Sequence, residues 1–191
     1  MQNEFIAFIA IVAVGILIAI VVIRKRSQQR SSELREHFGP EYDHVLEKHG
    51  DRARAEQELR SREKRREELD IHLLSPAQCE RFGAAWATVQ QRFVDDPSGA
   101  VVEADGLVKE VMKARGYPMG DFEQRLADLS VEHANVLDHY RAARGLAKSN
   151  ADGQASTEDL RQAMVHFRAL FTDLLRAEAR TAPPPLRESL A

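Results

Sequence analysis

Carboxylates and histidines at helical spacing are the residues of this sequence most able to do chemistry. Glu41 and His44 have the Glu-x-x-His spacing by which helical bundles hold a di-iron centre. That centre needs a second such motif and two further carboxylates, and the sequence has only one copy, in a highly charged segment. We therefore predict that this pair binds no metal.

A second group of histidines lies further along the chain, among polar neighbours. His133 and His139 are six residues apart, so they fall on different faces of a helix, unlike the i,i+4 pair of a zinc protease. We expect ordinary polar surface here, with His133 helping to cap its helix. His166 is expected at the edge of a buried stripe, and Cys79 on an apolar stripe as a buried, unreactive thiol.

Signals for nucleotide or nucleic-acid binding are missing. No glycine-rich phosphate loop of either common type occurs in the sequence. The basic run at 60–66 contains Glu63 and no aromatic residue for base stacking, and the sequence pI is about 6.2. We predict no nucleic-acid partner, no cofactor, no metal and no catalytic residue.

The first structural element that the sequence predicts is an apolar run at residues 5–23. Of its 19 residues, 18 are Ala, Val, Ile, Leu or Phe, and the exception is Gly15. A helix of this length covers roughly 28 Å, about the thickness of the bilayer hydrocarbon. The run has neither a polar stripe nor the basic start and small-residue cleavage site of a secretory signal. It predicts a retained single-pass transmembrane helix.

Basic residues follow this run and none precedes it. They are Arg24, Lys25, Arg26 and Arg30. Because cytoplasmic flanks carry the positive charge, we expect the N-terminus outside and the rest of the chain in the cytoplasm, at the inner (cytoplasmic) membrane. The predicted partners are the lipid bilayer and an unidentified protein. The spacing of Gly15 and Ala19 is a weak signal for a homo-oligomer.

Composition then divides the chain into four parts. We predict a membrane anchor with its basic flank at 1–30, a charged helical stalk at 31–70, a helical bundle at 71–180 and a proline-rich disordered tail at 181–191. Residues 24–70 hold 9 apolar residues in 47, whereas residues 71–180 hold 51 in 110. Only the third part has enough apolar residues for a sizeable core.

The stalk shows a pattern of exposed helices. A short helix is expected from a cap at Ser32 to Gly39, and Pro40 suits the first turn of the next. Residues 51–70 carry 14 charges, arranged as opposite i,i+4 pairs such as Arg52 with Glu56, and only Leu59 and Leu69 are large and apolar. We interpret this stretch as a solvated spacer helix rather than a coiled coil.

The bundle is predicted from helix caps and apolar stripes. Helix starts are expected at Ser75, Asp96, Asp121, Ser130 and Ser156, and Gly116 is an expected helix end. The stripe after Ser75 steps by three and four residues through Cys79, Phe82, Trp86, Val89 and Phe93. No segment alternates with period two. The fold class is therefore all-α: a transmembrane helix, a charged stalk and about five packed helices.

Four phrases, in this order, resemble a family of uncharacterised bacterial proteins with one N-terminal membrane helix. They are LREHFGPEYD at 34–43, RFVDDP at 92–97, RGYP at 115–118 and STEDLR at 156–161. The resemblance implies a bacterial, membrane-anchored helical protein. It implies no activity and no site residues.

Two functions are consistent with these sequence features. The order of tether, stalk and bundle favours a membrane-anchored, non-enzymatic interaction or scaffold protein. The alternative is an enzyme or small-ligand-binding protein with a site between the bundle helices, built from Tyr117, His133, His139 or Tyr140.

Overall fold

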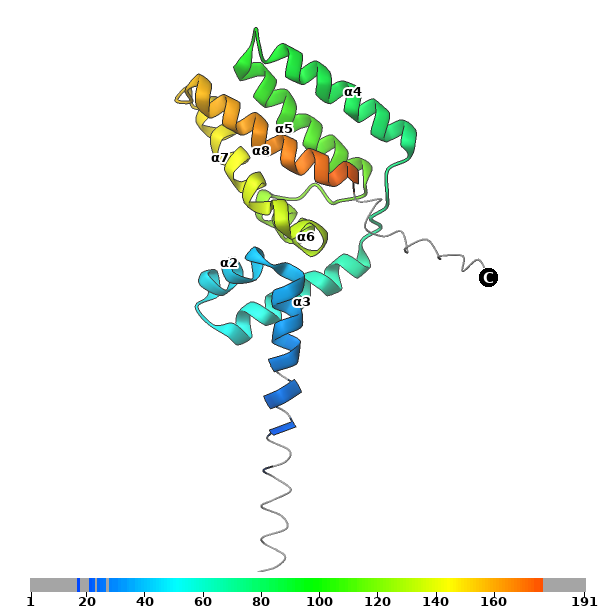
Figure 1. The fold of residues 1–191 in the computed structure, drawn as a ribbon, viewed down its shortest axis with the longest axis vertical. Coiled ribbons are helices and arrows are strands. Elements are labelled where there is room, and N and C mark those ends of the chain that lie inside the picture. The colour runs from blue at the N-terminus through cyan, green and yellow to red at the C-terminus, as the bar shows by residue number, and fades with distance from the viewer. Residues whose placement is uncertain (1–16, 18–20, 23, 27, 177–191) are drawn as a thin grey trace, which may run out of the picture. The chain divides into compact units, whose positions relative to one another are not determined.

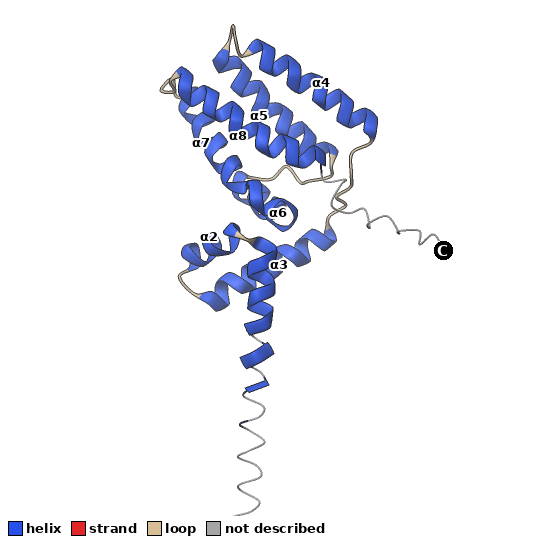
Figure 2. Cartoon of the chain, in the orientation of Figure 1, coloured by secondary structure: helices blue, strands red, loops and turns tan. Residues whose placement is uncertain are grey.

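The described part of the chain is helical throughout. A computed structural model describes residues 17, 21, 22, 24–26 and 28–176, and these ranges contain helices and connecting loops without a strand (Figures 1 and 2). The all-α prediction is confirmed for them. The predicted span at 5–23 lies almost entirely outside the described residues. Within them, no helix combines the length and the apolar character that crossing a membrane requires.

Two compact units make up the chain, with their boundary between residues 60 and 61. In the first, Arg24, Lys25, Arg26 and Arg30 are helical and exposed, and helix continues over 28–38. Helix α2 (Pro40–His49) follows, with Pro40 in its first turn as predicted, and α3 (Arg52–Glu68) begins after Gly50. The expected cap at Ser32 is wrong, because the helix already runs through that residue.

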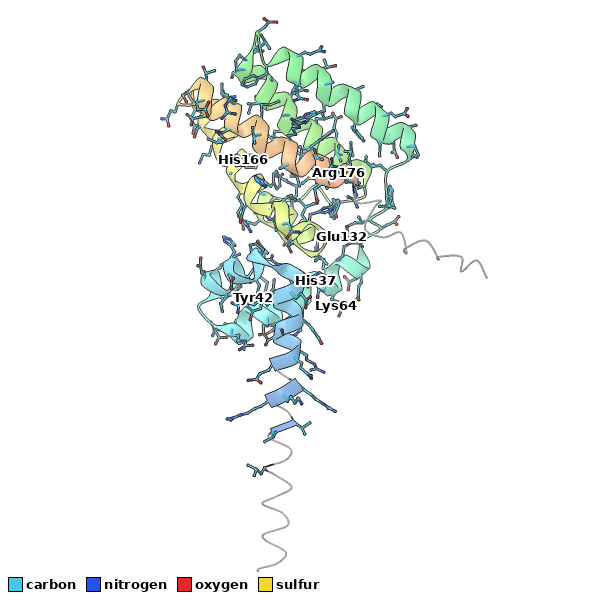
Figure 3. The ribbon with its side chains drawn as sticks, in the orientation of Figure 1. His37, Tyr42, Lys64, Glu132, His166 and Arg176 are labelled. Atoms are coloured by element: carbon cyan, nitrogen blue, oxygen red, sulfur yellow. The ribbon has the colours of Figure 1, made fainter. Side chains whose placement is uncertain are left out.

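A small core holds the first unit together, which corrects the prediction of a solvated spacer. Its buried apolar side chains come from 28–38, α2 and the start of α3: Leu34, Phe38, Tyr42, Val45, Ala55 and Leu59. Glu56 is buried beside them and accepts hydrogen bonds from Ser31, from Tyr42 (labelled in Figure 3) at 3.1 Å and from Arg52 at 2.8 Å. Few apolar residues suffice, because three short helices bring them together.

The second unit begins at Ser61, before the predicted start of the bundle at residue 71, and it contains a bundle of helices. Its helices are α4 (Pro76–Arg92), α5 (Pro97–Ala114), α6 (Phe122–His133), α7 (Leu137–Ala151) and α8 (Thr157–Arg176), with a 3-10 turn at Ala134–Val136. Helix α8 packs against α5 and α7, and α5 also packs against α4 (Figure 1). The core fills the space between them, and Phe167, Leu170 and Leu174 of α8 are almost completely buried in it.

Local capping chemistry sets most of these boundaries. Ser75 forms a capping box with Gln78, while Asp96 and Asp121 accept hydrogen bonds from the backbone N–H groups of Gly99 and Gln124. These three starts are confirmed. Ser130 starts no helix; it lies buried inside α6, where its hydroxyl donates to the carbonyl of Ala127 at 2.7 Å.

Gly116 ends α5 in a conformation that glycine favours. Its φ is +90°, its N–H donates to the Lys113 carbonyl, and the Tyr117 N–H donates to the Met112 carbonyl, which is the Schellman pattern. A Cβ at Gly116 would lie 2.1 Å from the backbone oxygen of Asp70. The end of α5 and the segment before α4 therefore approach each other closely only because this residue is glycine.

We predict that Gly116→Ala lowers the free energy of unfolding by at least about 1–3 kcal/mol, the usual cost of a strained backbone conformation, before the steric clash is added. Urea unfolding of the full chain in mild detergent measures it. Gly145→Ala is the matched control, since Gly145 lies inside α7 with open space around its Cβ position. That variant should be more stable by about 0.4–1 kcal/mol. Equal behaviour of the two variants would contradict the prediction.

Candidate functional site

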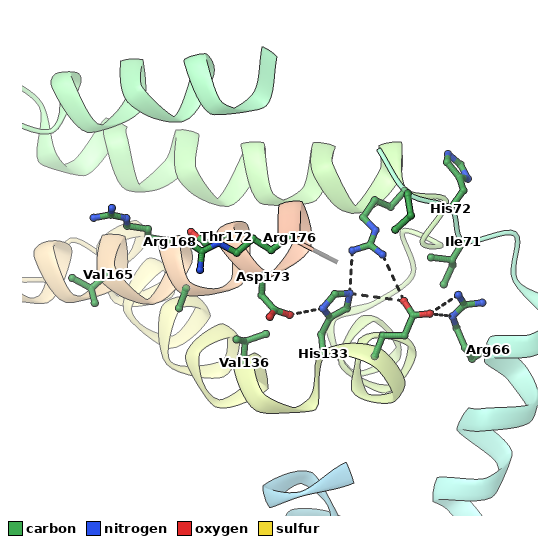
Figure 4. A pocket seen from close by; sticks show the side chains of 14 residues that line it. Arg66, Ile71, His72, His133, Val136, Val165, Arg168, Thr172, Asp173 and Arg176 are labelled. Carbon is green, nitrogen blue, oxygen red and sulfur yellow. Dashed lines mark hydrogen bonds and ion pairs between the residues drawn. The ribbon is translucent and has the colours of Figure 1, made fainter. Parts of the chain in front are cut away.

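A groove within the second unit is the candidate site. It encloses about 860 Å³ between α8, the end of α6 and the segment that precedes α4 (Figure 4). Its lining residues are Arg66, Ile71, His72, Leu73, Arg115, Glu132, His133, Val136, Val165, Arg168, Ala169, Thr172, Asp173 and Arg176. This volume lies within the range of roughly 300–1,000 Å³ typical of small-molecule sites.

Helix α8 forms one wall through two rows of side chains at i,i+4 spacing. One row is Val165, Ala169 and Asp173, and the other is Arg168, Thr172 and Arg176. The core side chains Phe167, Leu170 and Leu174 lie on the remaining face of the same helix. Helix α8 is thus buried on one side and open on the other, and the open side mixes apolar and cationic groups.

Arg115 occupies the inner end of the groove as a buried cation. Arg115 is the C-cap residue of α5, directly before Gly116, and it is only 2% exposed. One of its Nη groups donates to the backbone carbonyl of Leu174 at 2.9 Å. That carbonyl belongs to the last turn of α8, where helix carbonyls have no partner within the helix and a cation is favoured. Arg115 therefore ties the ends of α5 and α8 together.

His133 joins Arg115 to a carboxylate of α8. Its Nε2 lies 3.2 Å from Arg115 Nη1, and its Nδ1 lies 2.5 Å from Asp173 Oδ2. Because a guanidinium can only donate, we assign Nε2 as the acceptor and the ring hydrogen to Nδ1, which donates to Asp173. Both ring nitrogens are then occupied. The imidazole is held in place by its partners and has no free lone pair for general-base chemistry.

Glu132 compensates the positive charges at this end. It accepts from Arg66 Nε at 2.8 Å and from the hydroxyl of Tyr117 at 2.9 Å, and Arg115 Nη2 lies 3.7 Å from it. Figure 4 shows how Arg66, a residue of the charged stretch at 51–70, reaches this cluster. Arg65 and Arg62 of the same helix bond Asp128 and Ser130 of α6. This end of α3 is therefore also no solvated spacer.

The cluster shifts the pKa of two of its members. Burial, followed by the charge of Glu132, raises the pKa of the Tyr117 phenol, so the hydroxyl stays a donor. Burial alone would raise the pKa of Glu132, but the hydrogen bonds from Tyr117 and Arg66 outweigh it and lower that pKa below its usual value. The folded state therefore favours the Glu132 carboxylate.

This shift predicts a pH dependence of stability. A carboxyl whose pKa is lowered by folding stabilises the protein above its unfolded pKa of about 4.3 and loses that effect as the pH falls through its folded pKa. The difference in urea midpoint between wild type and Glu132→Gln should be largest near pH 6 and shrink below about pH 4. Glu123→Gln, at an exposed position of α6, should match wild type throughout. A pH-independent difference for Glu132→Gln would refute the prediction.

The structure brings together only two of the four residues proposed for a site between the helices. Tyr117 and His133 lie close together, with ring centroids 6.1 Å apart, and of the two only His133 lines the groove. His139 instead pairs with His166 of α8, their Nδ1 atoms 2.8 Å apart, and Tyr140 is buried in the core against Phe122. The expectation that His133 lies on polar surface is wrong, because His133 is only 2% exposed.

The remaining sequence candidates lie apart from the groove. Glu41 is buried and His44 is exposed, so the two side chains of the Glu-x-x-His pair are not directed into a common site. Cys79 is half-buried against the bundle core rather than fully buried. Within the described ranges, no group of three or more His, Cys, Asp or Glu side chains is placed to hold a metal.

Comparisons of the chain with protein-family models, with curated proteins and with solved structures find no match. The evidence for function therefore comes from the groove itself. Sequence reasoning missed most of its charged lining: Arg66, Arg115, Glu132, Arg168, Asp173 and Arg176. The sequence does contain one indication of the groove. On the last helix, residues 165, 169 and 173 and residues 168, 172 and 176 form two rows at i,i+4 spacing, and these rows lie on a different face from the apolar core stripe.

Proposed function

We propose that this protein is a membrane-anchored, non-enzymatic binding protein whose helical bundle recognises its ligand or partner in the groove along α8. The membrane part of the proposal is supported by the apolar run at 5–23 and by the basic residues that follow it. The same asymmetry supports a single-pass orientation at the inner membrane, with the bundle in the cytoplasm.

The groove is the observation that carries the binding role. It is large enough for a specific ligand, and it has apolar walls together with several cations. Its buried imidazole, that of His133, already uses both nitrogens on Arg115 and Asp173. Such a cluster fixes the shape and charge of a surface, which suits recognition better than proton transfer. Only two of the four residues suggested for an enzyme site lie close together, so we favour binding.

Membrane attachment is tested by fractionation and labelling. The full chain should stay with the membrane after alkaline carbonate extraction, and a variant lacking residues 1–23 should be released. For orientation, Cys79→Ala combined with Ser189→Cys leaves a single new thiol in the tail. An impermeant maleimide should label it only after the inner membrane is opened. Labelling in cells permeabilised at the outer membrane alone would overturn the orientation.

Recognition by the groove is tested with a photoreactive amino acid in living cells. A benzophenone side chain at Leu73, which is 45% exposed at the groove, should give an adduct visible in the intact mass of the purified chain. The same group at Val94, 81% exposed between α4 and α5, is the control and should give none. Adducts at both positions, or none at Leu73, would contradict a recognition role for the groove.

A further inference from the structure

The charges of the groove are unequally compensated. At the inner end, Glu132 compensates Arg66 and Arg115, and Asp173 accepts from His133. On the other row of α8, Arg168 and Arg176 are exposed and have no carboxylate partner among the described residues. In all, four arginines face two carboxylates in the lining. The uncompensated positive charge is therefore confined to one row of α8.

That row lies beside an apolar surface. Arg168, Thr172 and Arg176 line the same side of α8 in Figure 4. Ile71, Val136 and Val165 supply apolar lining, and Val165 is 47% exposed, a large apolar side chain open to solvent. Exposed apolar surface rimmed by charge is typical of a binding site. Its complement is a molecule with an apolar body and an anionic head.

We propose that the groove binds a single-chain amphipathic acid, that is, an acyl chain ending in a carboxylate. The chain would lie on the apolar lining, and the carboxylate would accept hydrogen bonds from Arg168 and Arg176, whose planar guanidinium groups match it in geometry. The volume of about 860 Å³ suits one small ligand. The inference rests on the proposed function, because it names the ligand class of the same groove, and a membrane tether would keep the bundle close to a source of acyl chains.

The test uses the full chain in nanodiscs of phosphatidylcholine, which carries no net charge. The probes are a diazirine-labelled dodecanoic acid and the matching dodecanol, which share the chain and differ in the head. We expect the acid to label peptides covering 71–73 and 165–176, and dodecanol to label them at least about tenfold less. Unlabelled dodecanoate should compete. Equal labelling by acid and alcohol, or labelling spread over all exposed segments, would overturn the proposal.

Variants separate the charge from the chain contact. Arg168→Gln with Arg176→Gln should weaken labelling by the acid about tenfold and leave the weak labelling by dodecanol unchanged. Arg81→Gln is the control, since Arg81 is an exposed arginine of α4 outside the groove, and it should behave as wild type. Ala169→Trp should fill the groove and abolish labelling by both probes. An unaffected double variant would contradict the role of the two arginines.

Other occupants are distinguishable outcomes. A photoreactive phosphatidylglycerol in the same nanodiscs should label the groove weakly; if it labels as strongly as the acid, the ligand is a membrane phospholipid and the single-chain proposal fails. A protein adduct at the Leu73 position, without labelling by dodecanoic acid, would keep the groove as the recognition surface and overturn only the ligand class. The two proposals therefore fail separately.

Discussion

Replacing Arg115 with Met is expected to lower the free energy of unfolding by about 3–5 kcal/mol, the usual result when one partner of a buried charged cluster is removed. The guanidinium holds the Leu174 carbonyl at 2.9 Å and His133 Nε2 at 3.2 Å, and it helps to compensate Glu132. Methionine fills similar space without a donor. The carbonyl and the imidazole would then stay buried without their hydrogen bonds, and that loss makes the cost large.

Urea unfolding, followed by the fluorescence of Trp86, the only tryptophan in the chain, measures this change. Lys113→Met is the matched control, because Lys113 is an exposed cation on the same helix, two residues away, and should cost less than about 0.5 kcal/mol. Arg115→Lys should fall between the two, since an ammonium keeps the charge but cannot reproduce the fork of donors. A loss below about 1 kcal/mol for Arg115→Met would show that the cluster contributes little.

The caps and the core stripes of the bundle are predictable from sequence because they depend on neighbours three or four residues away. Ser75 and Gln78 form one capping box, and Phe82, Trp86 and Val89 share one buried face for the same local reason. The turn at Gly116 also follows from local backbone geometry. Each of these features depends on residues within a short stretch of the chain, and simple spacing rules can therefore predict it.

The groove depends on partners far apart in sequence. Arg115 reaches Leu174 across 59 residues, Arg66 reaches Glu132 across 66, and Asp173 meets His133 across 40. Arg66 belongs to the charged stretch at 51–70, where the spacing predicts local i,i+4 pairs, and nothing local shows that its partner is on α6. The spacing of His133 and His139 correctly predicts that they lie apart, but nothing near them in sequence indicates the partners that α5 and α8 supply.

The first unit shows the same limit for apolar residues. Leu59 alone predicts little burial for a helix with so many charges, and it is in fact completely buried. Phe38 and Val45, which are also completely buried, come from two other helices of that unit. Composition counted along one helix underestimates a core that three helices share.

Trp86→Ala should cost about 3–5 kcal/mol, as expected for truncating a large buried aromatic side chain. Trp86 is 6% exposed and stacks on Phe171 of α8, with ring centroids 4.7 Å apart and planes 23° apart. Alanine would leave a cavity between α4 and α8 and remove this aromatic contact. Far-UV circular dichroism in urea measures the loss, because the variant has no tryptophan signal.

Trp86→Phe is the informative companion variant. The indole Nε1 is buried and has no hydrogen-bond partner among the described residues, so phenylalanine removes no hydrogen bond. It keeps a ring to stack on Phe171 and should therefore cost clearly less than alanine, about 1–2 kcal/mol for the lost volume. The gap between the two variants then measures packing alone. If phenylalanine costs as much as alanine, the indole nitrogen has a partner in solution and the site is more polar than the structure indicates.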